Sequence, residues 1–211
     1  MRLRWTLPDR SVYHQGVSVD TAGLPARARI LDAAFRLFYS RGIRAVGVDL
    51  LIAESGVAKA TFYKHFPTKE SLVVAYLHEV DRIWTGQLHD AATAAGDDPS
   101  DQLVGLFDAL TSACRRDGYR GCGFLNAAAE TPSGTPVHDA VVAHKQAVLC
   151  WITDLARRAG ATNPSGLARS LTLLLDGGLA SGALDADPDA ARQAAAAASV
   201  LVRAALPGQG R

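Results

Sequence analysis

The chain has 211 residues, of which 48% are hydrophobic, 7% are aromatic and 20% are charged, with a formal net charge of +1. This length allows one or two domains with a buried core, and the high alanine content with few strand-like runs favours an all-α fold. No apolar run reaches the roughly 18 residues that a membrane span requires, and the first residues lack the apolar segment of a secretory signal.

The three cysteines, Cys114, Cys122 and Cys150, are odd in number, far apart and without metal-ligand spacing. We therefore expect free thiols in a reducing cytoplasm and no metal or cofactor. Residues 1–70 carry 11 Lys and Arg against 6 Asp and Glu, a net +5, whereas residues 71–211 carry 11 against 15, a net −4. A basic first part is expected if only that part meets a polyanion, although chance also produces such differences.

Residues 1–24 form an extension without a core pattern, because polar residues dominate it. This extension is either a disordered arm without function or a basic arm that reaches DNA through Arg2, Arg4 and Arg10. The first helix is expected over residues 25–40. Pro25 is tolerated in its first turn, apolar residues recur along it at helical spacing, and Gly42 ends it.

The stretch GVDLLIAESGVAKATFYKHF, residues 47–66, predicts two short helices joined by a tight turn at Gly56. Phe62 and Phe66, four residues apart, point inward in the second helix. The polar side chains left on the outside are Lys59, Thr61, Tyr63, Lys64 and His65. A short helix with cations and hydroxyls on one face suits the major groove of DNA. The alternative is an ordinary helical hairpin with a solvated polar face.

Residues 26–77 resemble the DNA-binding domain of the TetR family of bacterial transcriptional repressors. The matching segments are ILDAAFRLF, Arg41-Gly42, VDLLIAESGV, KATFYKHF and the run from Pro67 to Leu72. Three positions depart from the family pattern: Gly47 replaces the usual capping Ser or Thr, and Ala58 and Ala60 replace the common Ser and Gly. The resemblance implies an all-α protein with a helix-turn-helix head over residues 25–70 and a ligand-binding and dimerisation body over residues 71–206.

Six further helices are expected in the body, which gives nine in all, the usual number in the family. Thr68 caps a long fourth helix that runs to the break at residues 96–99. The next helix, with Ser100 as its expected cap, covers residues 100–116. The others cover residues 124–130, 136–159, 165–183 and 188–206, with Thr135-Pro136 as a cap and first turn.

The segment GCGFLNAAAE, residues 121–130, followed by His144-Lys145, resembles the ligand-binding half of one branch of TetR-like regulators. Asn126 and Glu130 lie one turn apart among apolar residues, where they can orient a small ligand or satisfy neighbouring helix ends. The candidate pocket residues are Trp84, Phe107, Cys122, Phe124, Asn126, His144 and Trp151. The aromatic residues also fit a plain core, and Cys122 fits either a redox sensor or a small buried residue.

The last two helices combine a leucine-rich face with glycine and alanine, which lets helices approach closely and leaves an apolar surface that must be covered. In TetR relatives the equivalent pair packs against its copy as a four-helix dimer interface. The residues expected at this interface are Leu171, Leu174, Leu175, Val200 and Leu201.

These patterns and the resemblance predict a homodimeric transcriptional regulator. We expect a repressor that binds a palindromic double-stranded DNA operator and leaves it when a small-molecule effector binds. Base reading is assigned to Lys59, Ala60 and Thr61, and phosphate contacts to Tyr63, Lys64 and Lys69, with His65 beside them. The alternatives are a helical enzyme that uses the Cys and His residues of the body, for which no catalytic constellation is readable, and a helical adaptor that binds protein.

Overall fold

The computed structural model describes residues 23–184 and 189–207, so nearly all of the predicted extension, residues 1–24, lies outside the described residues. Within these ranges the chain is all-α, as expected. The helices are α1 (Ala26–Arg41), α2 (Val48–Ser55), α3 (Lys59–His65), α4 (Lys69–Ala94), α5 (Pro99–Gly105), α6 (Phe107–Cys114), α7 (Gly123–Glu130), α8 (Pro136–Arg158), α9 (Pro164–Leu184) and α10 (Asp189–Ala205). None of these helices is long and apolar enough to cross a membrane.

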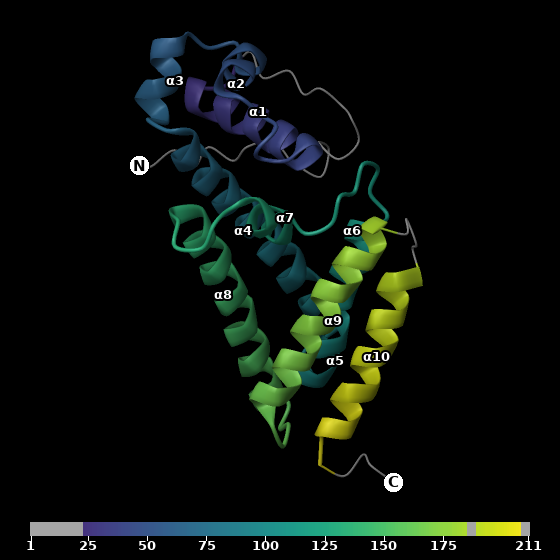
Figure 1. Cartoon of the computed structure of the whole chain (residues 1–211). Coiled ribbons are helices and arrows are strands. Elements are labelled where there is room, and N and C mark those ends of the chain that lie inside the picture. Colours follow the sequence, from purple (N-terminus) through teal and green to yellow (C-terminus); the bar gives the residue numbers. More distant parts are fainter. Residues whose placement is uncertain (1–22, 185–188, 208–211) are drawn as a thin grey trace.

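The helices form two parts that follow one another along the long axis of the molecule (Figure 1). Helices α1–α3, here called the head, lie together at one end of the molecule. Helices α4–α10, here called the body, form a bundle in which α8 and α10 run away from the head and α9 runs back toward it. Helix α4 joins the two parts, since it starts beneath α3 and continues into the body, and the short α7 lies close to the end of α1.

The head is built around the predicted pair of short helices. One hydrophobic cluster contains Phe62 of α3, Leu51 of α2 and Ile30 of α1, each with 0% of its surface exposed. Gly56 takes the left-handed conformation, with φ 60°, that the turn between α2 and α3 requires. Arg29 Nη1 donates a 3.2 Å hydrogen bond to the Gly56 carbonyl and fixes the turn to α1. The predicted helix-turn-helix is confirmed.

Two of the three predicted helix caps are confirmed. Thr68 Oγ1 accepts a hydrogen bond from the Ser71 backbone at the start of α4, and Thr135 Oγ1 accepts one from the His138 backbone at the start of α8. The cap of α5 is Asp98 and not Ser100, because the Asp98 carboxylate accepts from the Ser100 backbone N–H at 2.7 Å. A carboxylate is a strong acceptor at this position, and Pro99 then occupies the first helical turn.

The helix expected over residues 100–116 is interrupted at Leu106, which separates α5 from α6. The interruption follows Gly105, where α5 approaches α4 so closely that a Cβ would lie 2.3 Å from the Cβ of Ala95. If α5 and α6 are counted as one broken helix, the described ranges contain nine helices, as expected.

Tyr76 of α4 attaches the head to the body. Its ring packs edge-to-face against Phe35, with centroids 5.6 Å apart, and against Phe38, at 5.5 Å, both in α1. Only 2% of the Tyr76 surface is exposed. Aromatic pairs of this geometry add to the stabilisation from burial, so α1 and α4 are held together at the junction of head and body.

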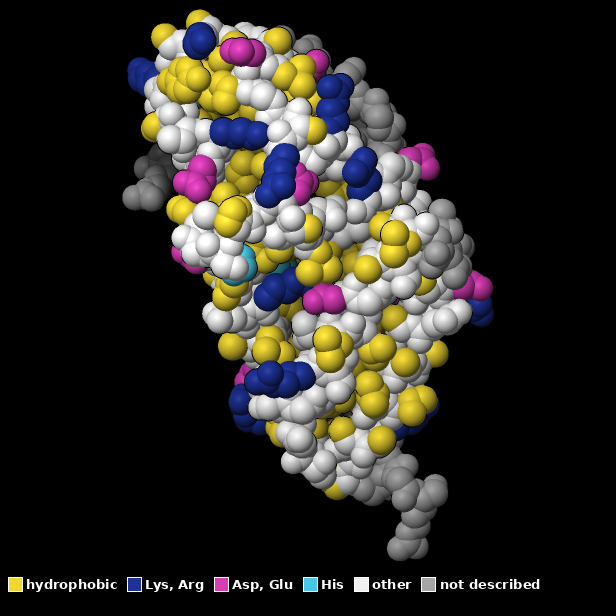
Figure 2. Space-filling model, viewed as in Figure 1, with side chains coloured by type: hydrophobic (Ala, Val, Ile, Leu, Met, Phe, Trp, Pro, Cys, Tyr) yellow, Lys and Arg dark blue, Asp and Glu magenta, His cyan; other side chains and the backbone are white. Residues whose placement is uncertain are grey.

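Helices α9 and α10 each have a buried and an exposed apolar face. Leu171 and Leu175 of α9 are 0% and 3% exposed and lie in the core of the single chain. On the outer face, Leu173 is 72% exposed and Val200 is 57% exposed. The other large apolar residues exposed on this pair are Leu184 and Leu201. Figure 2 shows hydrophobic side chains gathered over this part of the body.

Candidate nucleic-acid interface and buried cavity

The outer face of α3 is accessible to a partner. Lys59, Ala60 and Lys64 are exposed, Tyr63 is 42% exposed, and Thr61 is partly buried. His65, at the end of the helix, is partly buried too. Tyr63 lies edge-to-face against Phe62, with ring centroids 5.5 Å apart. The buried Phe62 therefore anchors a helix whose polar groups point away from the protein.

Positive charge is concentrated in the head. Residues 23–70 carry eight Lys and Arg against four Asp and Glu, a net +4. Figure 2 shows Lys and Arg side chains distributed over this end of the molecule. A basic surface around an exposed helix attracts a polyanion through long-range electrostatics, and the phosphate backbone of DNA supplies one charge about every 1.7 Å of helix axis.

Lys69 differs from the lysines of α3, because its ammonium group has a partner inside the protein. Lys69 Nζ donates a 2.6 Å hydrogen bond to the carbonyl of Ile43, in the loop between α1 and α2. Burial lowers the pKa of Lys69, and the charge of Glu130 opposes this shift. Lys69 therefore lies at the junction of head and body, and it has a structural role besides any contact with DNA.

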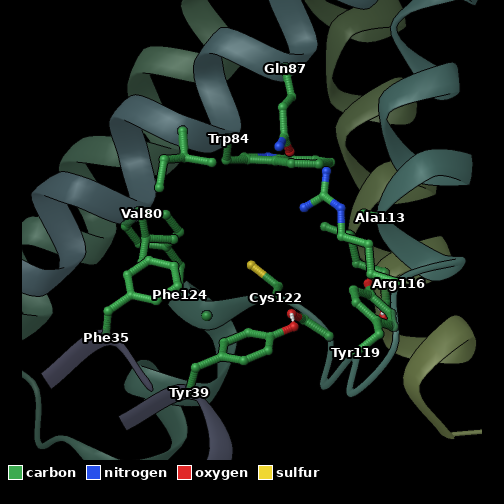
Figure 3. Close-up of a pocket in the computed structure, with 14 residues that line it drawn as sticks. Phe35, Tyr39, Val80, Trp84, Gln87, Ala113, Arg116, Tyr119, Cys122 and Phe124 are labelled. Carbon is green, nitrogen blue, oxygen red and sulfur yellow. Dashed lines mark hydrogen bonds between the residues drawn. The ribbon is translucent and has the colours of Figure 1, made fainter. Parts of the chain in front are cut away.

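A cavity of about 70 Å³ lies where the head meets the body, and its walls come from both. Figure 3 shows the lining side chains pointing toward one another across it. The residues that line it are Phe35 and Tyr39 of α1; Val80, Ile83, Trp84 and Gln87 of α4; Ala113 and Arg116 at the end of α6; Tyr119, Gly121 and Cys122 of the following loop; Gly123 and Phe124 of α7; and Leu179 of α9. Most of this lining is apolar.

The cavity brings together three of the seven predicted pocket residues: Trp84, Cys122 and Phe124. His144 stacks against Phe124 with ring centroids 3.7 Å apart, so it supports the wall without lining the cavity. The other three lie elsewhere. Phe107 is fully buried in the core, and Trp151 packs against His89 with ring centroids 4.1 Å apart.

Asn126, the third, is exposed and lies outside this cavity, along a surface groove that includes Leu125 and Ala180. Its Nδ2 donates a 2.9 Å hydrogen bond to the carbonyl of Arg120. Glu130 accepts from the Arg44 backbone N–H at 2.6 Å. Of the two sequence-based interpretations of Asn126 and Glu130, the structure favours the one in which they satisfy neighbouring backbone groups.

His144 has a buried side chain with one charged neighbour in hydrogen-bonding contact. Its Nδ1 lies 2.5 Å from Asp81 Oδ1. Burial lowers the pKa of His144 and outweighs the opposing effect of Asp81, while Lys145 lowers the pKa and Asp176 raises it by smaller amounts. The imidazole therefore stays neutral to a lower pH in the folded protein than in the unfolded chain.

Sequence reasoning missed the contribution of the head to this cavity. The apolar stripe expected along α1 contains neither Phe35 nor Tyr39, yet both line the cavity together with residues of the body. The sequence does contain a second apolar row beside that stripe, with one residue every four positions: Leu31, Phe35 and Tyr39. A second apolar row on an otherwise amphipathic helix indicates that the helix packs against two partners.

Polar contacts join the end of α1 to the loop that lines the cavity. Tyr39 Oη accepts a 2.9 Å hydrogen bond from the Arg120 backbone N–H and donates one of 3.2 Å to the Gly121 carbonyl. Arg120 Nη1 also donates to the Ser40 carbonyl at 2.5 Å. Burial raises the pKa of Tyr39, and the hydrogen bond from Arg120 and the charge of Arg116 oppose part of this shift. The loop is thus joined to the end of α1 by three hydrogen bonds.

An exposed helix-turn-helix on a helical body is the architecture of a DNA-binding transcriptional regulator, and comparison with known proteins agrees. Residues 30–76 match the family described as bacterial regulatory proteins, tetR family. The crystal structure of a TetR-family transcriptional regulator from Streptomyces coelicolor is 37% identical, with a TM-score of 0.80 over 85% of this chain and 95% of that one. The chain belongs to the TetR family.

Two curated relatives match this chain over shorter segments. An uncharacterized HTH-type transcriptional regulator of Mycobacterium tuberculosis is 40% identical over 57 residues, which is 27% of this chain and 28% of that protein. The HTH-type transcriptional regulator LmrA of Bacillus subtilis is 32% identical over 95 residues, 44% of this chain and 50% of LmrA. This chain therefore matches no more than half the length of either relative. These relatives are regulators, which sets the enzyme alternative aside.

Proposed function

We propose that the chain is a homodimeric repressor that binds a palindromic operator through α3 and is released when a small molecule occupies the cavity at the head–body junction. The observation that carries this proposal is that one cavity has walls from both the head and the body. The chain would then consist of a DNA-binding domain up to about residue 70 and an effector-binding and dimerisation domain after it. A protein with this partner works in the bacterial cytoplasm.

The DNA contacts follow from the exposure of α3. Base edges would be read by Lys59, Ala60 and Thr61 in its first turn, because the N-terminal residues of a recognition helix contact base edges in the major groove. Tyr63 and Lys64 continue along the accessible side of the helix and would contact phosphates, which fix the register of the protein on the duplex. Phosphate contacts would provide most of the affinity and make it dependent on salt.

The second copy would cover the exposed apolar face of α9 and α10. The large apolar side chains that this face leaves accessible are Leu173, Leu184, Val200 and Leu201. Exposed apolar surface gathered on one pair of helices is typical of an interaction surface. A twofold dimer would present two copies of α3 to successive major grooves, which lie about 34–36 Å apart.

Release by an effector would follow from the position of the cavity. A ligand in the cavity contacts Phe35 and Tyr39 of α1 as well as Trp84 of α4, so its affinity depends on how the head is oriented on the body. A ligand that binds more tightly to one orientation shifts the protein toward that orientation. If the favoured orientation no longer places both α3 helices in the grooves, ligand and operator oppose each other, and each weakens the other equally.

The test is a footprint of the purified full-length chain on the DNA that flanks its own gene. We expect protection of a roughly palindromic site whose half-sites lie about one helical turn apart, with affinity that falls steeply as salt increases. The matched control is Thr61→Ala, which should reduce preference for the protected site over unrelated DNA. Binding that shows no sequence preference and no dependence on salt contradicts the proposal and favours the protein-binding adaptor.

A further inference from the structure

The loop between α1 and α2, residues 42–47, is held by two groups of the body. Lys69 Nζ, at the start of α4, donates a hydrogen bond to the Ile43 carbonyl at 2.6 Å. Glu130, the last residue of α7, accepts two hydrogen bonds from the next residue of the loop. Its carboxylate accepts from the Arg44 backbone N–H at 2.6 Å, and its carbonyl accepts from Arg44 Nε at 2.8 Å. The body therefore contacts the chain just before the first helix of the helix-turn-helix.

The Glu130 carboxylate also packs against the backbone of Gly42. A Cβ at Gly42 would lie only 2.8 Å from Glu130 Oε1, and Gly42 has a φ of 85°. Glycine therefore meets two requirements at this position, a close approach of the carboxylate and a positive φ. Because Glu130 contacts the loop at both Gly42 and Arg44, it restrains the direction in which the loop leaves α1.

Helix α7 is itself fixed in the body. Phe124, in its first turn, is 1% exposed and stacks on His144 of α8 with ring centroids 3.7 Å apart. Ala127, three residues further on and on the same side of the helix, is 0% exposed. A helix with such a closely packed face does not shift without disturbing the core. The end of α7 is therefore a firm support for the Glu130 carboxylate.

The loop leads directly into α2, which packs against α3. Val46 of the loop is 0% exposed and belongs to the same hydrophobic cluster as Leu51 of α2 and Phe62 of α3. Arg29 of α1 holds the turn between these two helices. When Glu130 holds the loop, it therefore also restrains α2 and, through the packed core of the head, α3.

We infer that Glu130 is a positioning residue for operator binding. It fixes the orientation of the head on the body and thereby the separation of the two α3 helices that a dimer presents to DNA. This inference rests on the proposed homodimer and palindromic operator, and it adds the residue that sets the accepted half-site spacing. Glu130 belongs to the body and carries a charge that phosphates repel, so it acts on DNA binding through Gly42 and Arg44.

The first measurement follows the orientation of the head without DNA. Spin labels are attached to Cys150 of α8, which is exposed, and to Ala53→Cys on the exposed side of α2. The changes Cys114→Ala and Cys122→Ala prevent attachment elsewhere, and an excess of unlabelled chain ensures that only pairs within one chain contribute. We expect Glu130→Ala to broaden or shift the distribution of distances between the two labels. Glu130→Gln, which keeps an acceptor for the Arg44 N–H, should leave the distribution unchanged.

The second measurement is affinity for operators whose half-sites are moved apart or together by one base pair. Each base pair changes the separation by about 3.4 Å and rotates the half-sites by about a tenth of a turn. We expect the unaltered protein to bind these operators at least about tenfold more weakly than the natural one, and Glu130→Ala to reduce this penalty to about threefold or less. A role in local stability alone would lower the melting temperature of Glu130→Ala and leave the spacing preference as it is.

Glu130→Gln is the matched control, because it removes the charge and keeps the acceptor. The inference is overturned if Glu130→Ala retains the spacing preference, whether or not the label distances change, or if Glu130→Gln loses that preference to the same extent. Failure of the proposed function gives a different result. A chain that binds no palindromic operator in any variant refutes the proposed function and the role in half-site spacing together, and the label distances then show whether Glu130 still orients the head.

Discussion

Replacement of Lys64 by alanine tests the DNA interface most directly. Lys64 is exposed on the outer face of α3, and a dimer presents it twice. Each phosphate contact contributes about 0.9 to the slope of log K against log salt. Loss of both copies should therefore flatten the slope by about 1.8, which corresponds to about a twelvefold change in relative affinity between 50 and 200 mM salt.

Lys69 is the matched comparison, because it carries the same charge in a different environment. Its ammonium group donates to the Ile43 carbonyl at 2.6 Å and is partly buried. Lys69→Ala should lower the free energy of unfolding by about 1 kcal/mol, the typical net contribution of one such hydrogen bond. It should flatten the salt slope less than Lys64→Ala, since its ammonium is already bound within the protein.

The assay is fluorescence anisotropy of a labelled operator at several salt concentrations, with thermal melting of each variant in parallel. We expect Lys64→Ala to melt like the unaltered protein and to show the flatter slope. A slope that stays unchanged in Lys64→Ala, with the protein folded and dimeric, would remove Lys64 from the interface. An equal loss of slope in both variants would show that Lys69 leaves Ile43 to contact phosphate.

Three further outcomes are expected. Val200→Glu should give a folded monomer with weak operator affinity, whereas Leu175→Glu should unfold the chain, because Val200 is 57% and Leu175 only 3% exposed. Size-exclusion chromatography and circular dichroism distinguish the two outcomes. A Val200→Glu variant that remains dimeric contradicts the proposed interface. Glu130→Ala should speed amide hydrogen exchange in the α1–α2 loop, since it removes an acceptor at 2.6 Å, whereas Glu130→Gln, which keeps an acceptor, should not. The pKa of His144 is lowered on folding, so as pH drops the unfolded chain protonates this imidazole before the folded protein does, and the free energy of unfolding falls below about pH 6.5. His144→Gln should lose this part of the pH dependence of stability. An unchanged pH profile in this variant would show that His144 does not cause it.

The sequence predicted the head better than the body for a physical reason. The head is made from local patterns: Gly56 needs a particular backbone conformation, and Phe62 and Phe66 define a buried face within one turn of helix. Such signals depend on neighbours in the chain. The contacts of the body depend on residues far apart, such as the 63 residues that separate His144 from Asp81. Periodicity shows that a leucine is buried, but not whether its own chain or a second copy covers it.

Leu171 and Leu175 illustrate this ambiguity. Both belong to an apolar face that had to be covered, and the sequence predicts them on or just beneath a dimer interface. Within the single chain they are already 0% and 3% exposed. The same limit applies to Asn126. A polar residue among alanines on a short helix is equally compatible with a pocket and with the exposed groove where it lies, because the direction of the helix face depends on how α7 is docked.

The cavity has two physical connections to the DNA-binding head, and they act on the same helix. One is direct, because Phe35 and Tyr39 of α1 form part of the wall. The other passes through the loop after α6, whose Gly121 lines the cavity and accepts a hydrogen bond from Tyr39. A ligand that displaced either the wall or the loop would therefore act at the C-terminal half of α1. Arg29 near the other end of α1 holds the turn between α2 and α3. Under the proposed function, a tilt of α1 would therefore move α3 with it, and α4 would not need to bend for the signal to reach DNA.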